Sequence, residues 1–451
     1  MQTMNSQKDK EFLFKSAMYN ILGTVLKVAG PLLAILTARI FGKESFGLFV
    51  STQLWILTLS RISVLGLDKG LQWFLPQNSV QNRPVHYGYN ETIIRSITIA
   101  LCIFFTLIFC AGFELHKYAK SLEILSRAEI VIYALSLLPW VLLHIYGGAS
   151  EGMRKPQYKI FITDCSVAAM APLIAIALYF FGIPYALPIG LLSANILGCI
   201  FYLPLVKKLF PGNPGLSLEK VPKELLLYSL PRGFSEVIAS ILYRVDLWLV
   251  LLLLGPGEAG VYSVMLTVAN ALRTVANSFG PILLPVVAGM NEERLKNDLK
   301  PTFSYCVGMT SCIQLVIGFF IVMFPEEILS IAGKSFIVQP EALGILLLAN
   351  VSFGLFGMVG IVISGLGKSF HMMKVDIISL CTAFVANYFL IPIFGLVGAA
   401  ISTFIFALTQ VTLNNIYLFK LGFFPYTKKL LINIGLTVAL AVFFIIKHWQ
   451  V

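Results

Sequence analysis

Long apolar runs separated by short polar segments dominate this chain. Runs of about 18–25 apolar residues recur from Ala17 to Ile446, the length at which a helix crosses a hydrocarbon core roughly 30 Å thick. Segments such as Ile160–Phe180 are apolar on nearly all sides, whereas strands of a membrane barrel alternate between apolar and polar positions. We therefore predict thirteen transmembrane helices, at residues 17–40, 46–68, 92–113, 128–150, 160–181, 184–206, 225–254, 260–285, 302–324, 341–364, 374–392, 396–418 and 428–446.

The composition supports an all-α polytopic membrane protein. Hydrophobic residues make up 58% of the 451 residues and charged residues 12%, against roughly 45–50% and ~25% in soluble domains. The run Ala17–Ile40 is too long for a signal peptide and lacks a small-residue cleavage site. The seven cysteines lie in apolar runs without a CxxC spacing, so we predict neither a metal site nor a cofactor.

The basic residues predict the orientation. Of 33 Lys and Arg, twenty lie at span ends or between spans on the side of the N-terminus, seven lie so on the opposite side, and six lie further inside the predicted spans. By the positive-inside rule the N-terminus is cytoplasmic. Basic residues spread over many short segments are explained by topology, so we do not predict a nucleic-acid partner. The seven on the opposite side are Arg39, Lys43, Lys117, Lys120, Arg127, Lys334 and Lys447.

The chain resembles itself when it is shifted along its own sequence. Matches with one constant offset occur at three well-separated places, each in an equivalent loop: Gly42 with Gly255, Gly47 with Gly260, Phe49 with Tyr262, Gly152 with Gly365, Lys155 with Lys368, Phe181 with Phe394 and Gly182 with Gly395. Six helices per repeat is an even number, so the two halves keep the same membrane orientation. We expect two six-helix lobes in a parallel 6+6 repeat around a central cavity.

This repeat predicts the domain organisation. The Pro- and Gly-rich basic segment Lys207–Lys223 reads as a linker on the cytoplasmic side. The predicted parts are a cytoplasmic tail (1–16), an N-terminal lobe (17–206), the linker (207–224), a C-terminal lobe (225–418) and an additional transmembrane segment (419–451).

Polar stripes on three predicted helices each contain one deeply placed cation. A charge at a helix centre costs roughly 2.5–3.5 kcal/mol on insertion scales, so each needs a partner or an aqueous cavity. Lys27 lies on the first helix and Arg61 on the second, while Arg273 on the eighth shares a face with Asn270 and Asn277. We predict that these residues line one cavity. In the alternative each cation locks helix packing by pairing with an acid, for example Arg61 with Asp68 on the second helix.

The seventh helix supplies further candidates. Arg232 and Glu236 are spaced to neutralise each other, which leaves a binding role and a structural pair equally open. Asp246 shares their face with Tyr243, and is a candidate for a lone acid that binds a coupling cation or proton. The alternative for Asp246 is a salt bridge between helices.

An excess of cations over acids on these faces selects anions. Arg holds phosphate with two parallel hydrogen bonds and Lys acts as a point charge, so a pyrophosphate head group suits such a site. Amide and phenol neighbours such as Asn270, Asn277 and Tyr243 suit sugars.

Three segments resemble bacterial polysaccharide-unit flippases, the O-antigen and exopolysaccharide branch of the multidrug/oligosaccharidyl-lipid/polysaccharide exporter superfamily. They are TARIFGKESFGLFVSTQLWILTLSRISVLGLDKGLQWFLP (Thr37–Pro76), YRVDLWLVLLLLGPGEAGVYSV (Tyr243–Val264) and EGMRKPQYK (Glu151–Lys159). The resemblance implies a 6+6 helix fold in the bacterial plasma (inner) membrane. It also implies alternating access and a substrate built on undecaprenyl pyrophosphate. Lys27, Arg61 and Arg273 match cations that related lipid II flippases use.

The function that this resemblance implies is transport, not catalysis. We expect a flippase that moves a lipid-linked oligosaccharide unit to the outer leaflet for O-antigen, capsule or exopolysaccharide (lipopolysaccharide-type) biosynthesis. Its expected partners are that substrate, the lipid bilayer and the polymerase and chain-length regulator of the same pathway. Two alternatives stay open: a multidrug cation antiporter of the same superfamily, which needs acids to dominate its cavity, and a membrane polysaccharide polymerase. The chain has no Walker-type phosphate loop, which argues against direct ATP use.

Overall fold

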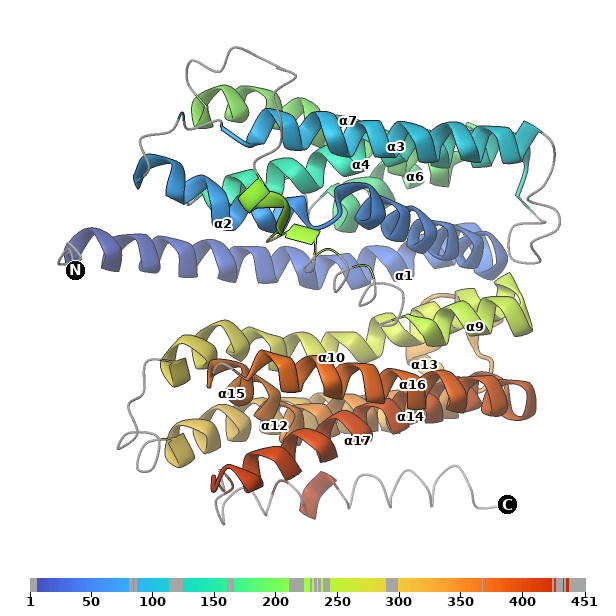
Figure 1. Ribbon diagram of the computed structural model, residues 1–451. Helices are drawn as coiled ribbons and strands as arrows, with labels where there is room; N and C mark the ends of the chain where they lie inside the picture. The colour runs from blue at the N-terminus through green and yellow to red at the C-terminus, as the bar shows by residue number, and fades with distance from the viewer. Residues whose placement is uncertain are drawn as a thin grey trace. The chain divides into compact units, whose positions relative to one another are not determined.

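The computed structural model describes residues 6–80, 84, 87–112, 125–153, 155–159, 162, 166–210, 223–227, 229–230, 233, 237, 244–288, 299–366, 368–423, 426, 433 and 435–437. Side chains at some helical positions, including 6–29 and 274–286, are outside the described set. Every regular element of the described residues is helical (Figure 1), which confirms the predicted all-α class. Six helices of the described part are long and apolar enough to cross a membrane, and three shorter apolar helices accompany them.

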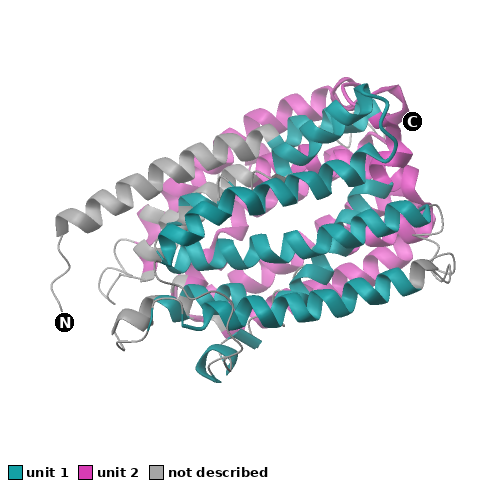
Figure 2. Cartoon of the chain, turned by 90° about the horizontal axis from the view of Figure 1, so that it is seen from above, with its two compact units in different colours: residues 1–40, 48–242 teal, residues 41–47, 243–451 magenta. Residues whose placement is uncertain are grey.

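The chain forms two compact units (Figure 2). Unit 1 comprises residues 1–40 and 48–242, and unit 2 comprises residues 41–47 and 243–451. The division falls between Leu242 and Tyr243, inside the predicted seventh helix. Residues 223–227 and 229–230 are helical in unit 1, whereas the helix that starts at Val245 lies in unit 2. The predicted linker at 207–224 and the lobe boundaries stay predictions.

In unit 1, α4 is the central helix and packs on α2, α3 and α7, while α6 packs on α7. A capping box starts α4, in which the Ser126 hydroxyl accepts from the Glu129 amide and the Glu129 carboxylate accepts from the Ser126 amide. The helices of this unit are α1 (Ser6–Val64), α2 (Leu67–Val80), α3 (Tyr89–Gly112), α4 (Arg127–Gly152), α5 (Pro156–Tyr158), the π-helical turn η3 (Ser166–Met170), α6 (Ala171–Phe180) and α7 (Ala186–Leu209).

In unit 2, α10 packs on α9, α12, α14 and α15, and α17 packs on α14 and α16. The predicted additional helix at 428–446 falls mostly outside the described residues. Within it, Asn433 donates a hydrogen bond to the Ser311 hydroxyl at 2.7 Å. The elements are α9 (Val245–Leu254), α10 (Pro256–Ala288), α12 (Leu299–Met323), α13 (Pro325–Ser330), η4 (Lys334–Phe336), α14 (Glu341–Ser352), the π-helical turn η5 (Phe353–Gly357), α15 (Val359–Gly365), α16 (Ser369–Phe394) and α17 (Leu396–Lys420).

The internal repeat is visible in the backbone. The run α14–η5–α15 covers 341–365, and α4, shifted by the offset that relates Gly42 to Gly255, covers 340–365. Gly42 and Gly255 themselves share a conformation that L side chains rarely adopt, with φ/ψ of 80°/166° and 99°/177°. The first two predicted spans are therefore joined by a kink at Gly42 rather than by a loop.

Residues 41–47 belong to unit 2 because they pack on the start of α10. A Cβ on Gly47 would lie 1.9 Å from the Pro256 carbonyl oxygen, and one on Gly260 would lie 2.1 Å from the Lys43 carbonyl oxygen. Gly47 and Gly260 are themselves equivalent positions of the two repeats. Lys43 also forms an ion pair with Glu258 at 3.6 Å.

Candidate functional site

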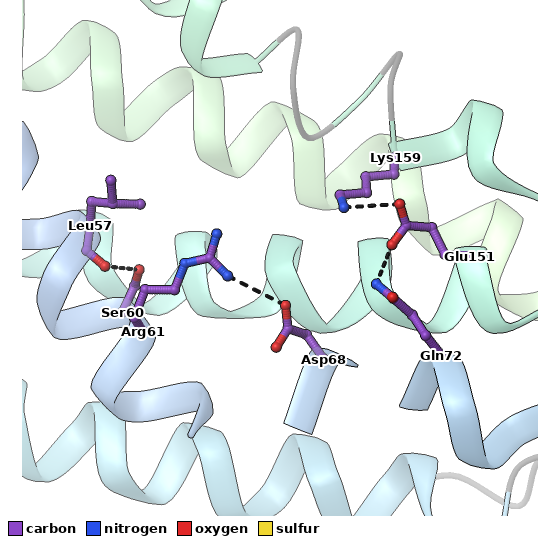
Figure 3. Close-up of polar contacts among 7 residues, drawn as sticks. All are labelled: Leu57, Ser60, Arg61, Asp68, Gln72, Glu151 and Lys159. Atoms are coloured by element: carbon purple, nitrogen blue, oxygen red, sulfur yellow. Dashed lines mark hydrogen bonds and ion pairs between the residues drawn. The ribbon is translucent and has the colours of Figure 1, made fainter. Parts of the chain in front are cut away.

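Arg61 and Asp68 form an ion pair within unit 1 (Figure 3). The Nη1 atom of Arg61 lies 3.5 Å from Oδ2 of Asp68, and their side chains are 23% and 7% exposed. The prediction that both residues lie on one helix was wrong. Leu65 and Gly66 have φ values of 49° and 73°, which ends α1 at Val64 and places Asp68 in the first turn of α2. The helix N-terminus adds favourable electrostatics for this carboxylate.

The sequence analysis did not predict helix α2, because it left residues 69–91 between two predicted spans. The available signal was amphipathic spacing. Leu67, Leu71, Phe74 and Leu75 recur at helical intervals, and all four are buried. The face packs closely on α4, because a Cβ on Gly148 would lie 2.3 Å from the Asp68 carbonyl oxygen.

A second polar group continues from this pair along α2 and α4. One carboxylate oxygen of Glu151 accepts a hydrogen bond from Nε2 of Gln72. The other forms an ion pair with Nζ of Lys159 at a distance of 2.9 Å. Figure 3 shows the Glu151 carboxylate between the two donors. Its side chain and that of Lys159 are 28% and 25% exposed, so both are only partly buried by the protein.

In unit 2 the carboxylate of Asp246 is held by hydroxyl groups. Its Oδ2 atom accepts hydrogen bonds from Tyr262 at 3.0 Å and from Thr403 at 3.1 Å, and Oδ1 accepts from the amide of Leu247 at 2.8 Å. The residue is 7% exposed. Within the described part of the chain it has no ion-pair partner, so the alternative of a salt bridge finds no support there.

Arg273 in α10 is paired with an aromatic ring. Its guanidinium carbon lies 4.4 Å from the centroid of Phe353, the first residue of the π-helical turn η5. π-helical turns are frequent at functional sites. The preceding carbonyl, that of Leu272, accepts a hydrogen bond from Gln314 at 2.8 Å, which fixes α10 against α12. Asn270 lies in α10 three residues before Arg273.

The remaining predicted site residues lie outside what the structure describes. Lys27 and Asn277 are helical residues of α1 and α10 at positions whose side chains are not described. Arg232, Glu236 and Tyr243 are outside the described residues altogether. Among the described side chains, no group of three or more His, Cys, Asp or Glu could hold a metal ion.

Comparison with known proteins identifies the family to which the chain belongs. The family model described as "Polysaccharide biosynthesis protein" matches residues 13–291, more than half of the 451 residues. The chain belongs to the polysaccharide biosynthesis protein family. This confirms, at the level of the family, the resemblance seen in the sequence. One relative is an uncharacterized membrane protein of Methanocaldococcus jannaschii, 24% identical over 423 residues, which cover 87% of this chain and 81% of the relative.

Solved structures of transporters and flippases share the fold of this member of the polysaccharide biosynthesis protein family. The lipid II flippase MurJ in an inward closed conformation matches with a TM-score of 0.67 at 12% identity, covering 95% of this chain and 99% of MurJ. An inward-facing multidrug resistance transporter of the MATE family, in the MOP superfamily, matches with a TM-score of 0.65 at 14% identity, covering 88% and 99%. A MOP superfamily transporter from Pyrococcus furiosus, for which reverse polarity of the binding pocket suggests a different function, matches with a TM-score of 0.54 at 14% identity, covering 96% of each chain.

Proposed function

We propose that this protein is a flippase that moves an oligosaccharide linked to undecaprenyl pyrophosphate from the cytoplasmic to the outer leaflet of a bacterial plasma membrane. Membership of the polysaccharide biosynthesis protein family is the observation that carries the proposal. The product would serve surface polysaccharide biosynthesis, such as O-antigen, capsule or exopolysaccharide, and its expected partners are the polymerase and chain-length regulator. The N-terminus is cytoplasmic in this proposal, following the distribution of basic residues.

The pyrophosphate head group carries the negative charge of such a substrate, so cationic side chains are needed to bind it. Lys27 and Arg61 in α1 and Arg273 in α10 are the cations assigned to the pyrophosphate, and Asn270, Asn277, Arg232 and Tyr243 are the polar groups assigned to it or to the sugars. A guanidinium binds phosphate through two parallel hydrogen bonds. The lipid tail stays in the bilayer while the protein alternates between inward- and outward-open states.

Asp246 is the residue assigned to coupling. A buried carboxylate that accepts hydrogen bonds only from neutral groups in the described part of the chain keeps its negative charge uncompensated. Such a group binds a cation or a proton, and either could link transport to an ion gradient. Asp68 and Glu236 are assigned to ion pairs, of which the Arg61–Asp68 pair is present in unit 1.

A multidrug cation antiporter is the second candidate. The buried Asp246 carboxylate and the likeness of fold to multidrug resistance transporters favour it. It differs from the flippase in the sign of the ligand, because a cationic drug is repelled by Arg61 and Arg273 and attracted by Asp246.

Complementation tests the proposal. A strain that lacks its own oligosaccharide flippase receives the native chain, Arg61→Ala or Arg273→Ala, at matched amounts in the membrane. We expect the native chain to restore surface polysaccharide and each variant to lower it by about tenfold or more, because a charge-assisted hydrogen bond contributes roughly 1.5–3 kcal/mol. Full activity of both variants would reject the head-group assignment. Drug resistance conferred by the native chain without polysaccharide would favour the antiporter.

A further inference from the structure

The imidazole of His144 in α4 takes no part in the site described above. Its Nε2 atom is buried and forms no hydrogen bond with any residue in the described part of the chain. His144 precedes Gly148 by four residues and Glu151 by seven, so the three share the face of α4 that packs on α2. A buried polar atom without a partner is costly, so a ligand that pairs with it gains free energy.

Cations lie along this contact between α2 and α4. Arg61 pairs with Asp68, which precedes Lys69 in the first turn of α2, and Lys159 pairs with Glu151 on the face of α4 that carries His144. Two carboxylates, those of Asp68 and Glu151, already engage Arg61 and Lys159. Lys69, in the first turn of α2, forms no ion pair among the residues that the structure describes. Of the described residues named here, three are cations and two are acids, and they lie on the helix contact that includes the buried imidazole nitrogen.

Two of these cations are also partly exposed at the protein surface. The side chains of Arg61 and Lys159 are 23% and 25% exposed, although the imidazole nitrogen beside them is buried. The Arg61–Asp68 distance of 3.5 Å is longer than that of a strong charge-assisted hydrogen bond.

We propose that His144, Lys69 and Lys159 form, together with Arg61, a phosphate-binding site within unit 1. A diphosphate has enough oxygen atoms to accept from an imidazole N–H, a guanidinium and two ammonium groups at once, whereas a neutral sugar does not use the charge. The inference rests on the proposed function and deepens it, because it assigns to unit 1 its own contacts with the diphosphate of a lipid-linked substrate.

The experiment measures binding to the purified full chain in lipid nanodiscs. The probes are farnesyl diphosphate, inorganic pyrophosphate and farnesol, and binding is followed by calorimetry and by 31P NMR of the bound diphosphate. The variants are His144→Leu, which removes the nitrogen, His144→Gln, which keeps an N–H donor, and Lys69→Gln. Lys208→Gln is the matched control, since Lys208 is an exposed lysine in the last turn of α7 in the same unit.

We expect His144→Leu and Lys69→Gln each to weaken diphosphate binding by about tenfold, which corresponds to the loss of one charge-assisted hydrogen bond. His144→Gln retains most of the affinity, Lys208→Gln changes nothing, and farnesol binding is the same in all variants. Farnesyl diphosphate that binds tighter than pyrophosphate identifies a lipid head group as the ligand, and equal affinities identify free phosphate.

Native affinity in both His144→Leu and Lys69→Gln would overturn the site, as would an equal loss in Lys208→Gln. If His144→Leu fails to fold, Lys69→Gln alone decides, because its side chain is partly exposed. A chain that binds diphosphate through these residues but restores no surface polysaccharide would leave the site standing and reject the proposed function.

Discussion

Asp68 in unit 1 and Asp246 in unit 2 are both buried carboxylates in the first turn of a helix, but their partners differ. Asp68 is 5% exposed and pairs with the guanidinium of Arg61. Asp246 is 7% exposed and accepts from Tyr262, Thr403 and a backbone amide. The first charge is compensated within the protein. The second is stabilised only by hydroxyl and backbone dipoles in the described part of the chain.

The repeat shows that these two arrangements are not copies of each other. At the offset that relates Gly42 to Gly255, Asp246, Tyr262 and Thr403 correspond to Leu33, Phe49 and Gly190, and none of these side chains can hold a carboxylate or donate to one. In the other direction, Arg61, Asp68, Glu151 and Lys159 correspond to Thr274, Pro281, Ser364 and Met372.

The two halves therefore share backbone features, such as the conformation of Gly42 and Gly255, and differ in their charges. The break at Leu65 and Gly66 is not shared, because α10 continues through the equivalent positions from Pro256 to Ala288. The polar side chains give each unit its own chemistry.

Asp246→Asn should have the largest effect on transport. The carboxamide has nearly the same shape, and its oxygen still accepts from Tyr262 and Thr403, whereas its NH2 group replaces the oxygen that accepts from the Leu247 amide. The charge is lost at the cost of one backbone hydrogen bond. Transport should fall by about a hundredfold, because charge-assisted contacts contribute roughly 1.5–3 kcal/mol. The measurement is surface polysaccharide in a complemented strain, with protein in the membrane quantified. Asp68→Asn is the matched variant, and an equal loss in both would remove the distinction between the two acids.

A double-mutant cycle on Arg61 and Asp68 should have an intermediate effect, on stability. Arg61→Ala leaves a buried carboxylate without this partner and should lower the free energy of unfolding by about 1–2 kcal/mol, a value below that of a fully buried pair because Arg61 is partly exposed. Removing Asp68 as well should recover part of this loss without recovering diphosphate affinity. Thermal unfolding in nanodiscs measures the change in stability, and calorimetry measures the affinity for diphosphate. Recovery of affinity in the double variant would mean that the pair has only a structural role.

Phe353→Leu should have the smallest effect. It removes the ring under the Arg273 guanidinium, and a partly exposed cation–π contact contributes about 0.5–1 kcal/mol, so head-group affinity should fall by about threefold. The comparison is with Phe319→Leu, an exposed aromatic residue of α12, in the same calorimetric assay. No difference between the two variants would show that the turn η5 does not position Arg273.

The sequence by itself determined the helical class, the repeat and most helix positions, since these follow from local properties. Apolar length predicts a span, and a glycine between two apolar runs predicts a break, as at Gly42 and Gly255. The same local patterns identified Arg61, Arg273 and Asp246 as charged residues within apolar spans, which need a partner or an aqueous cavity.

The partners of these charges were decided only by the tertiary structure. Tyr262 and Thr403 meet Asp246 from 16 and 157 residues away in the chain, and no spacing rule predicts such contacts. The break at Leu65 and Gly66, which moves Asp68 to a new helix, comes with close packing, since a Cβ on Gly66 would lie 2.4 Å from the Gly233 amide nitrogen. Periodicity is a property of one helix, whereas a polar site is built where several helices approach one another, and that approach is set by the packing of side chains far apart in the sequence.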